Sequence, residues 1–159
     1  MKNRAGMLLI VFSLLSFLVA GCGPDNYEGQ LKLGKPHGRG AYYDEDGSMI
    51  YEGEFRNGEY HGQGTKYWSD GSKDYEGGFK DGKYHGQRIR YNFNSKEKWY
   101  EGEFKDGKQH GYGIEYFENG DVGYIGGWKD GELHGQGTQY NEDGSLYYKG
   151  EWKNDEPVR

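Results

Sequence analysis

The five histidines of this sequence are its most obvious candidates for acid–base or metal chemistry, because a glycine follows each of them. They are His37, His61, His85, His110 and His134, and the stretch HGQG occurs at two of them. A histidine beside flexible backbone can serve as a general base or as a metal ligand. The histidines are separated by a regular 24 or 25 residues, which indicates that they belong to a repeated element.

The whole region 27–159 is built from this repeat of about 24 residues. The second copy reads YEGEFRNGEYHGQGTKYWSDGSKD, the third contains one extra residue and the sixth is shortened. The copies begin at Tyr27, Tyr51, Tyr75, Tyr100, Tyr124 and Tyr148. We therefore expect one domain of five full repeats and a partial sixth over residues 27–159.

The first five positions of each unit alternate in character. Odd positions carry Tyr, Gly and an apolar residue, as in Tyr51, Gly53 and Phe55, whereas even positions are mostly charged. A period of two indicates a strand with one packed face. A glycine between two aromatic residues weakens a strand unless something covers it, so we expect a neighbouring ring to lie over Gly53.

Two sets of turns divide each unit into a hairpin, because Asn-Gly and Asp-Gly pairs accept the positive φ of tight turns. The first set is Asn57-Gly58, Asp81-Gly82, Asp106-Gly107 and Asp130-Gly131, and the second is Asp46-Gly47, Asp70-Gly71, Asn119-Gly120 and Asp143-Gly144. The strands between them end at Tyr43, Tyr67, Tyr91, Tyr116 and Tyr140. The pattern predicts an all-β fold, an elongated single-layer antiparallel sheet of stacked hairpins.

In this arrangement the histidines are not placed to bind a metal ion together or to act in catalysis. Equivalent residues of successive hairpins lie two strands apart, roughly 9.5 Å. Zinc needs its nitrogen ligands at about 2.1 Å, so two such histidines cannot share an ion. No nucleophile accompanies any one of them. We expect them to hydrogen-bond backbone at the hairpin bend, and we expect no metal, no cofactor and no catalytic residue.

The YEGEF, DG and HG-G spacing resembles the MORN (membrane occupation and recognition nexus) repeat family over residues 27–159. The resemblance implies a twisted, groove-forming sheet. Enzymes that carry MORN repeats catalyse with a separate domain, so the resemblance implies a chain that is not an enzyme. Bacterial MORN-type proteins include proposed antitoxin or immunity factors, and a toxin is therefore one class of partner.

The N-terminus resembles a bacterial lipoprotein signal. A basic start precedes the apolar run Met7–Ala20, which leads to Leu18-Val19-Ala20-Gly21-Cys22 with the only cysteine. We expect residues 1–21 to be a signal peptide, Cys22 to be lipidated and residues 22–26 to form a short tether. An ordinary signal-peptide cleavage site is the alternative. Gly23, rather than Asp, follows Cys22, which favours the periplasmic side of the outer membrane if the source is Gram-negative.

The net charge of the protein after signal-peptide removal limits which partners it can bind in the cell envelope. Without residues 1–21 the chain has 18 basic and 26 acidic residues, a net charge of −8. Such a chain repels phosphate backbones, so we expect no nucleic acid. The sixth position of every unit is nevertheless basic: Lys32, Arg56, Lys80, Lys105, Lys129 and Lys153. This column is either a solvated face or a set of lipid-headgroup contacts.

Departures from the repeat are candidates for specific binding. Arg88 stands where the other full units have glycine, and the same unit carries Phe93 and Trp99. Arginine there must lift a neighbouring ring or project from the sheet, so these three residues form a candidate contact patch or reflect drift in a tolerant loop. In the last unit Asp155 replaces the turn glycine and Glu156-Pro157 follows, which protects the sheet edge.

Three functions remain compatible with the sequence. The first is a membrane-anchored protein-interaction scaffold that uses the aromatic-rich sheet or its open edge. The second is binding of phospholipid headgroups by the basic column. The third is binding of carbohydrate or peptidoglycan, with aromatic rings stacked on sugar faces.

Overall fold

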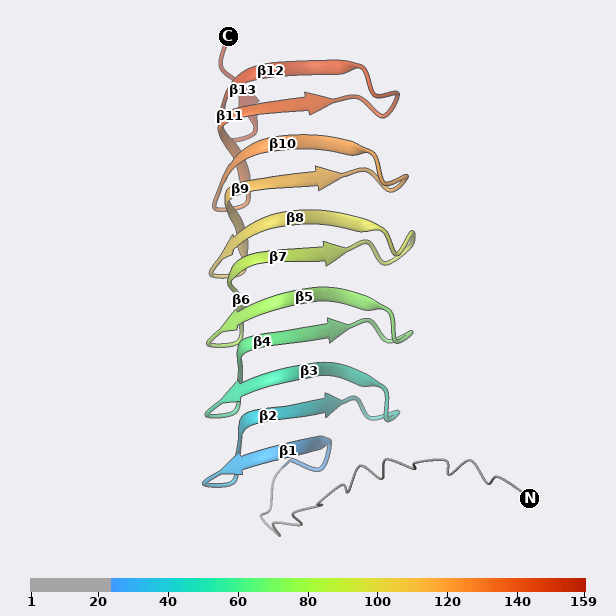
Figure 1. Ribbon diagram of the computed structural model, residues 1–159, viewed down its shortest axis with the longest axis vertical. Coiled ribbons are helices and arrows are strands. Elements are labelled where there is room, and N and C mark those ends of the chain that lie inside the picture. Colours follow the sequence, from blue (N-terminus) through green and yellow to red (C-terminus); the bar gives the residue numbers. More distant parts are fainter. Residues whose placement is uncertain (1–23) are drawn as a thin grey trace, which may run out of the picture.

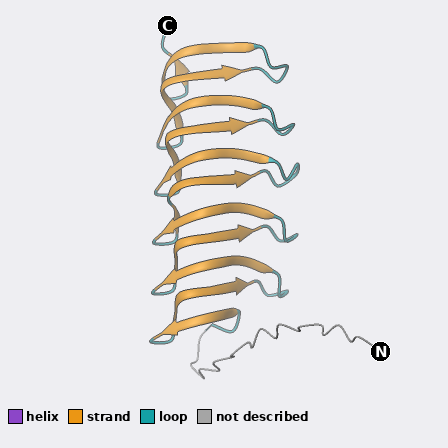
Figure 2. Ribbon diagram, in the orientation of Figure 1, coloured by secondary structure: helices purple, strands orange, loops and turns teal. Residues whose placement is uncertain are grey.

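The computed structural model describes residues 24–159, and the predicted signal peptide and Cys22 lie outside this range. Every regular element in that range is a strand (Figure 2). Over the same residues there is accordingly no helix with the length and apolar character needed to cross a membrane. The prediction of an all-β fold is confirmed.

The strands form one antiparallel sheet in which each strand lies beside its neighbours in sequence (Figure 1). They are β1 (Tyr27–Lys32), β2 (Lys35–Tyr43), β3 (Met49–Arg56), β4 (Glu59–Tyr67), β5 (Lys73–Lys80), β6 (Lys83–Tyr84), β7 (Gly86–Tyr91), β8 (Lys98–Lys105), β9 (Lys108–Tyr116), β10 (Val122–Lys129), β11 (Glu132–Tyr140), β12 (Leu146–Lys153) and β13 (Glu156–Pro157). Only β6 is off this path, and it pairs with β5. The hairpins therefore stack into a single elongated layer.

Tight turns join the two strands of each hairpin along one side of the sheet. Asn57 and Gly58 both have positive φ, of 55° and 94°, and Asp81 and Gly82 have 50° and 75°. These values match the two-residue turn that fits the twist of a hairpin. The turn predictions are confirmed, and we call this side of the sheet the tight-turn edge.

The pairing within the hairpins also contains an irregularity that the alternation did not predict. The pairing of β3 with β4 shifts by two residues between Gly53 and Glu54, where β4 has the extra residues Gly62 and Gln63, and the pairings of β1 with β2 and of β8 with β9 shift at the equivalent place. A bulge of this kind increases the local twist of the strand pair. The first strands of the hairpins are bowed, as Figure 1 shows for β3, β5 and β8.

Aromatic rings on one face of the sheet supply the core. Tyr51 packs edge-on against Phe55 of its own strand and against Phe79 of the next unit, with ring centroids 5.1 Å apart in both pairs. The same two contacts recur around Tyr75, Tyr100 and Tyr124. These four tyrosines are at most 1 % exposed. The rings form one continuous ladder that links each hairpin to the next.

The ladder explains the glycine at the third position. The Tyr51 hydroxyl donates a hydrogen bond to the Glu54 carbonyl oxygen at 3.0 Å, so the ring crosses over the strand between them. A Cβ at Gly53 or at Gly64 would overlap that hydroxyl. The expected ring over Gly53 is present, and it belongs to Tyr51 of the same strand.

Hydrogen bonds along the tight-turn edge tie successive hairpins together. The Gly58 amide donates to the Pro36 carbonyl oxygen at 2.8 Å, and the later turns repeat this bond. The Asn57 amide donates to Nδ1 of His37 at 3.5 Å, and His110 accepts in the same way from Asp130. The expected backbone role is thus observed for His37 and His110, and it joins two repeats.

Candidate functional site

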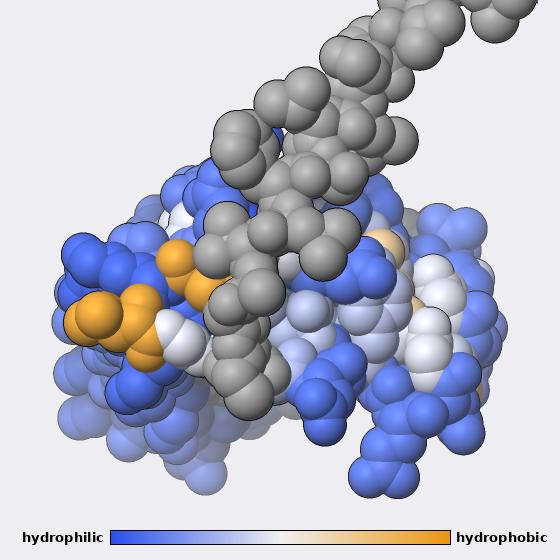
Figure 3. Space-filling view, turned by 90° about the horizontal axis from the view of Figure 1, so that it is seen from below, coloured by the Kyte–Doolittle hydropathy of each residue, from blue (hydrophilic) through white to orange (hydrophobic). Residues whose placement is uncertain are grey.

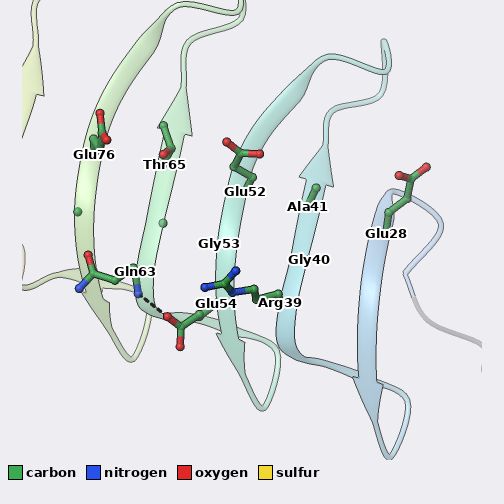
Figure 4. Close-up of a pocket in the computed structure, with 12 residues that line it drawn as sticks. Glu28, Arg39, Gly40, Ala41, Glu52, Gly53, Glu54, Gln63, Thr65 and Glu76 are labelled. Atoms are coloured by element: carbon green, nitrogen blue, oxygen red, sulfur yellow. Dashed lines mark hydrogen bonds between the residues drawn. The ribbon is translucent and has the colours of Figure 1, made fainter. Parts of the chain in front are cut away.

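A groove crosses β1 to β5 on the face opposite the aromatic ladder. It has a volume of about 580 Å³. Figure 4 shows Glu28, Glu52 and Glu76 side by side along it, with Arg39 and Glu54 nearer the tight-turn edge. Adjacent residues of a strand point to opposite faces, so the glutamate after each ladder tyrosine must lie here. The alternation of the repeat therefore builds both the core and the groove.

Tyrosine hydroxyls hold two of the groove carboxylates in place. Tyr43 donates to Glu28 at 3.2 Å, and Tyr67 donates to Glu52 at 2.6 Å. Burial, together with the bond to Glu52, raises the pKa of Tyr67 to about 12, so this phenol remains a donor at neutral pH. The carboxylates are oriented acceptors, and the groove is suited to cationic and hydrogen-bond-donating groups.

Two of the three residues of the predicted contact patch come together. Phe93 and Trp99 line a hollow of about 260 Å³ with Trp68 and Arg90. The Phe93 ring lies 5.3 Å from Trp68 and is 47 % exposed, and the Arg90 guanidinium lies 4.9 Å from the Trp99 ring. Arg88 does not line this hollow. The patch as predicted therefore separates into two places.

Arg88 lies flat along the aromatic face. It stands opposite Gly102, and its side chain covers the space above Gly77 and Gly78. Tyr75 is not lifted, because it is fully buried and still donates to the Gly78 carbonyl oxygen at 2.8 Å. Neither expected displacement is observed. The strand pairing of this hairpin is interrupted at Arg88: β5 pairs with β6 at two positions and with β7 at two, and no pair joins Gly77 to Arg88.

Asp74 is a buried acid that the sequence analysis missed. Its side chain is 3 % exposed, and it lies 3.7 Å from Lys66 Nζ and 3.5 Å from Arg90 Nε. The Tyr84 hydroxyl donates to it at 3.2 Å. The residue at the same position of other units is uncharged: Ile50, Trp99, Gly123 and Tyr147. A single charged residue at this position of the repeat was therefore the feature of the sequence that could have indicated Asp74.

The basic column lies exposed along the tight-turn edge. Three of its lysines stand directly opposite a second lysine, in the pairs Lys32–Lys35, Lys80–Lys83 and Lys105–Lys108. Arg56 instead lies 3.6 Å from Asp81 of the following turn. The column is thus partly neutralised and partly a set of adjacent like charges, which destabilise a strand pair.

The histidines do not assemble a metal centre in the described region. Among residues 24–159 no group of three or more His, Cys, Asp or Glu residues is placed to hold an ion. His61 Nδ1 lies 3.7 Å from an Asp81 oxygen, which places it in the same turn contact as Arg56. Three of the histidines, His37, His61 and His110, thus contact the turn of the following hairpin.

Comparison with protein families agrees with the geometry of the repeats. The MORN repeat model matches residues 27–49, 51–73, 75–87, 100–122, 124–146 and 148–158, more than half of the chain. The chain belongs to the MORN repeat family. The third MORN match ends at Gln87, immediately before Arg88. A comparison with curated proteins found no match.

Membership in the MORN family sets the general class of function. MORN repeats generally mediate protein–protein or protein–membrane interactions, and proteins built from them are typically non-catalytic binding proteins. Seen along the stack from the β1 end, the surface of the described residues is mostly hydrophilic (Figure 3).

Proposed function

We propose that this MORN protein is a non-catalytic, membrane-anchored scaffold that holds a protein partner in the carboxylate-lined groove. The observation that supports the proposal is the groove itself, which spans five strands and aligns Glu28, Glu52 and Glu76. The ladder rings are unavailable to a partner because they are buried against one another. A partner segment with lysine or arginine side chains complements the groove.

The anchor completes the proposal. Acyl chains on Cys22 hold the protein in the cell envelope, on the periplasmic side of the outer membrane in a Gram-negative cell. The described chain begins at Pro24, three residues before β1, so the groove lies at the anchored end of the stack. A toxin that the scaffold neutralises is one partner of this kind.

The test is a cross-linked pull-down of the tagged full-length protein from detergent-solubilised envelopes. The variants are Glu52→Lys/Glu76→Lys in the groove and Cys22→Ser at the anchor, and the charge-matched control is Glu132→Lys/Glu142→Lys. We expect a stoichiometric protein that is retained by the control, lost with the groove variant and depleted with Cys22→Ser. Equal recovery with the groove variant and the control would refute the groove as the binding site.

The paired lysines support a second function, binding of anionic headgroups at the tight-turn edge. Lys80 and Lys83 repel one another across their hairpin, and a phosphate placed between them removes that cost. Flotation with phosphatidylglycerol vesicles at low and physiological salt tests this. We expect Lys80→Ala/Lys83→Ala to reduce binding, whereas Lys73→Ala/Lys98→Ala, which removes two ion-paired lysines, leaves it unchanged.

The carbohydrate alternative loses its main support. Tyr51, Tyr75, Tyr100 and Tyr124 are at most 1 % exposed, so a sugar ring cannot stack on them. The exposed rings, among them Phe93, Tyr112 and Tyr147, lie outside the ladder of buried rings.

A further inference from the structure

The outer edge of each first strand is a place where the stack accepts another strand. β3, β5, β8, β10 and β12 all pair on that side with the second strand of the preceding hairpin. Within residues 24–159 nothing pairs with the corresponding edge of β1. The backbone groups along this edge are therefore available to an added strand.

The opposite end of the stack is partly covered by the chain itself. β13 pairs with the end of β12, where Trp152 faces Pro157. The Val158 amide then donates to the Glu151 carbonyl oxygen at 2.8 Å, and the Tyr148 hydroxyl donates to the Val158 carbonyl oxygen at 2.7 Å. Proline has no amide hydrogen to offer a further strand. The two ends thus differ: the described chain covers β12 at residues 151–153, whereas it leaves the outer edge of β1 unpaired along its whole length.

We propose that β1 is an interface for a second copy of this chain, paired antiparallel about a two-fold axis with Gly29 opposite Gly29 of the second copy. Every strand pair in the molecule is antiparallel, and glycines already face one another across them, as Gly40 faces Gly53 and Gly53 faces Gly64. Gly29 opposite Gly29 continues this glycine-to-glycine pairing across the two-fold axis.

The sequence of β1 is self-complementary in this register. Leu31 faces Tyr27 of the second copy, which supplies a ring that no preceding repeat provides in the described chain. Phe55, the equivalent of Leu31, packs on two tyrosines, Tyr27 at 5.0 Å and Tyr51 at 5.1 Å. On the other face Glu28 lies opposite Gln30 and diagonal to both Lys32 and Glu28 of the second copy, within reach of the lysine. The two-fold axis creates the Glu28–Lys32 pair twice and the Glu28–Glu28 pair once.

The interface uses residues 27–32, and of these Glu28 also lines the proposed partner-binding groove. An isologous interface closes on itself, so the assembly stops at two copies. Copies anchored to one membrane would meet with their β1 ends at the same height, which favours the pairing.

The test is the protein mass of the full-length chain in mild detergent, measured by light scattering over a range of concentrations. We expect a monomer–dimer equilibrium. Glu28→Lys should weaken it by about tenfold, because two repulsive pairs replace two attractive ones. The charge swap Glu28→Lys/Lys32→Glu should restore it. The matched control is Glu52→Lys, since Glu52, like Glu28, accepts a hydrogen bond from a tyrosine of its own hairpin.

The outcomes separate the interface from other forms of association. A monomer at every concentration would overturn the proposal, as would a dimer that the charge swap fails to restore. Growth beyond two copies would indicate head-to-tail stacking and would also exclude the two-fold interface. Loss of partner binding by Glu52→Lys/Glu76→Lys with an unchanged dimer would keep the two proposals separate.

Discussion

At the scale of single residues, the tyrosine of each repeat and the glycine beneath it act as one unit. A Cβ at Gly64 would overlap the Tyr51 ring and hydroxyl, and Gly64 has no positive φ that would add backbone strain. We expect Gly64→Ala to lower the free energy of unfolding by about 1–3 kcal/mol through overpacking. Urea denaturation measures this. Gln63→Ala, an exposed neighbour, should change it by less than about 0.5 kcal/mol, and equal effects would contradict the packing argument.

The buried tyrosines should also make the folded state less stable at alkaline pH. Burial raises the pKa of Tyr124 to about 12 and raises the pKa of Tyr51, Tyr75 and Tyr100 further above the ordinary value of 10. The folded state favours the neutral phenol, so this stability is present below pH 10 and is lost as the pH rises through the folded pKa values.

We expect the free energy of unfolding to fall as the pH rises above 10. Tyrosinate absorbance at 295 nm, followed with circular dichroism, should show the buried tyrosines ionising together with loss of the sheet. Their ionisation near pH 10 in a sheet that remains folded would contradict the burial of the ladder.

At the scale of the hairpin, the third repeat is the weak element. Arg88 leaves β5 and β7 with two residue pairs, and its Nε is buried without a hydrogen-bond partner. Arg88→Gly should complete the hairpin and raise the free energy of unfolding by about 1 kcal/mol, because an unsatisfied buried donor is removed. Thermal denaturation measures the change, with Gln87→Ala as the exposed control. A clear loss of stability would show that the arginine supports the fold.

The hairpins could be predicted from sequence because the alternation and the Asn-Gly and Asp-Gly turns are local signals. The register shift after Gly53 could not, because it accompanies the packing of the Tyr51 ring across its own strand, which only the folded hairpin defines. The path of Arg88 along the sheet depends on the space above Gly77, which only the packed repeats define. Phe93 and Trp99 could be singled out as candidates because they break the repeat. Asp74 was missed although it breaks the repeat in the same way.

At the scale of the whole molecule, stability is distributed along a line, because each repeat contacts only its neighbours. Tyr100 packs against Phe104 of its own hairpin and Trp128 of the next, whereas Trp152 packs on Tyr124 and Tyr148 at the end of the stack. Removing either ring costs about 3–5 kcal/mol of local packing. The position of the removed ring along the stack should determine how many neighbouring strands are destabilised.

We therefore expect Tyr100→Ala and Trp152→Ala to differ in hydrogen exchange more than in local cost. Trp152→Ala should lose amide protection in β11, β12 and β13 while β1 to β5 keep theirs, because only the end of the stack frays. Tyr100→Ala should lose protection in β8 to β10 and unfold in two stages, because the two halves are no longer coupled. Uniform loss of protection in both variants would mean that the sheet unfolds as one cooperative unit, and the linear description would be wrong.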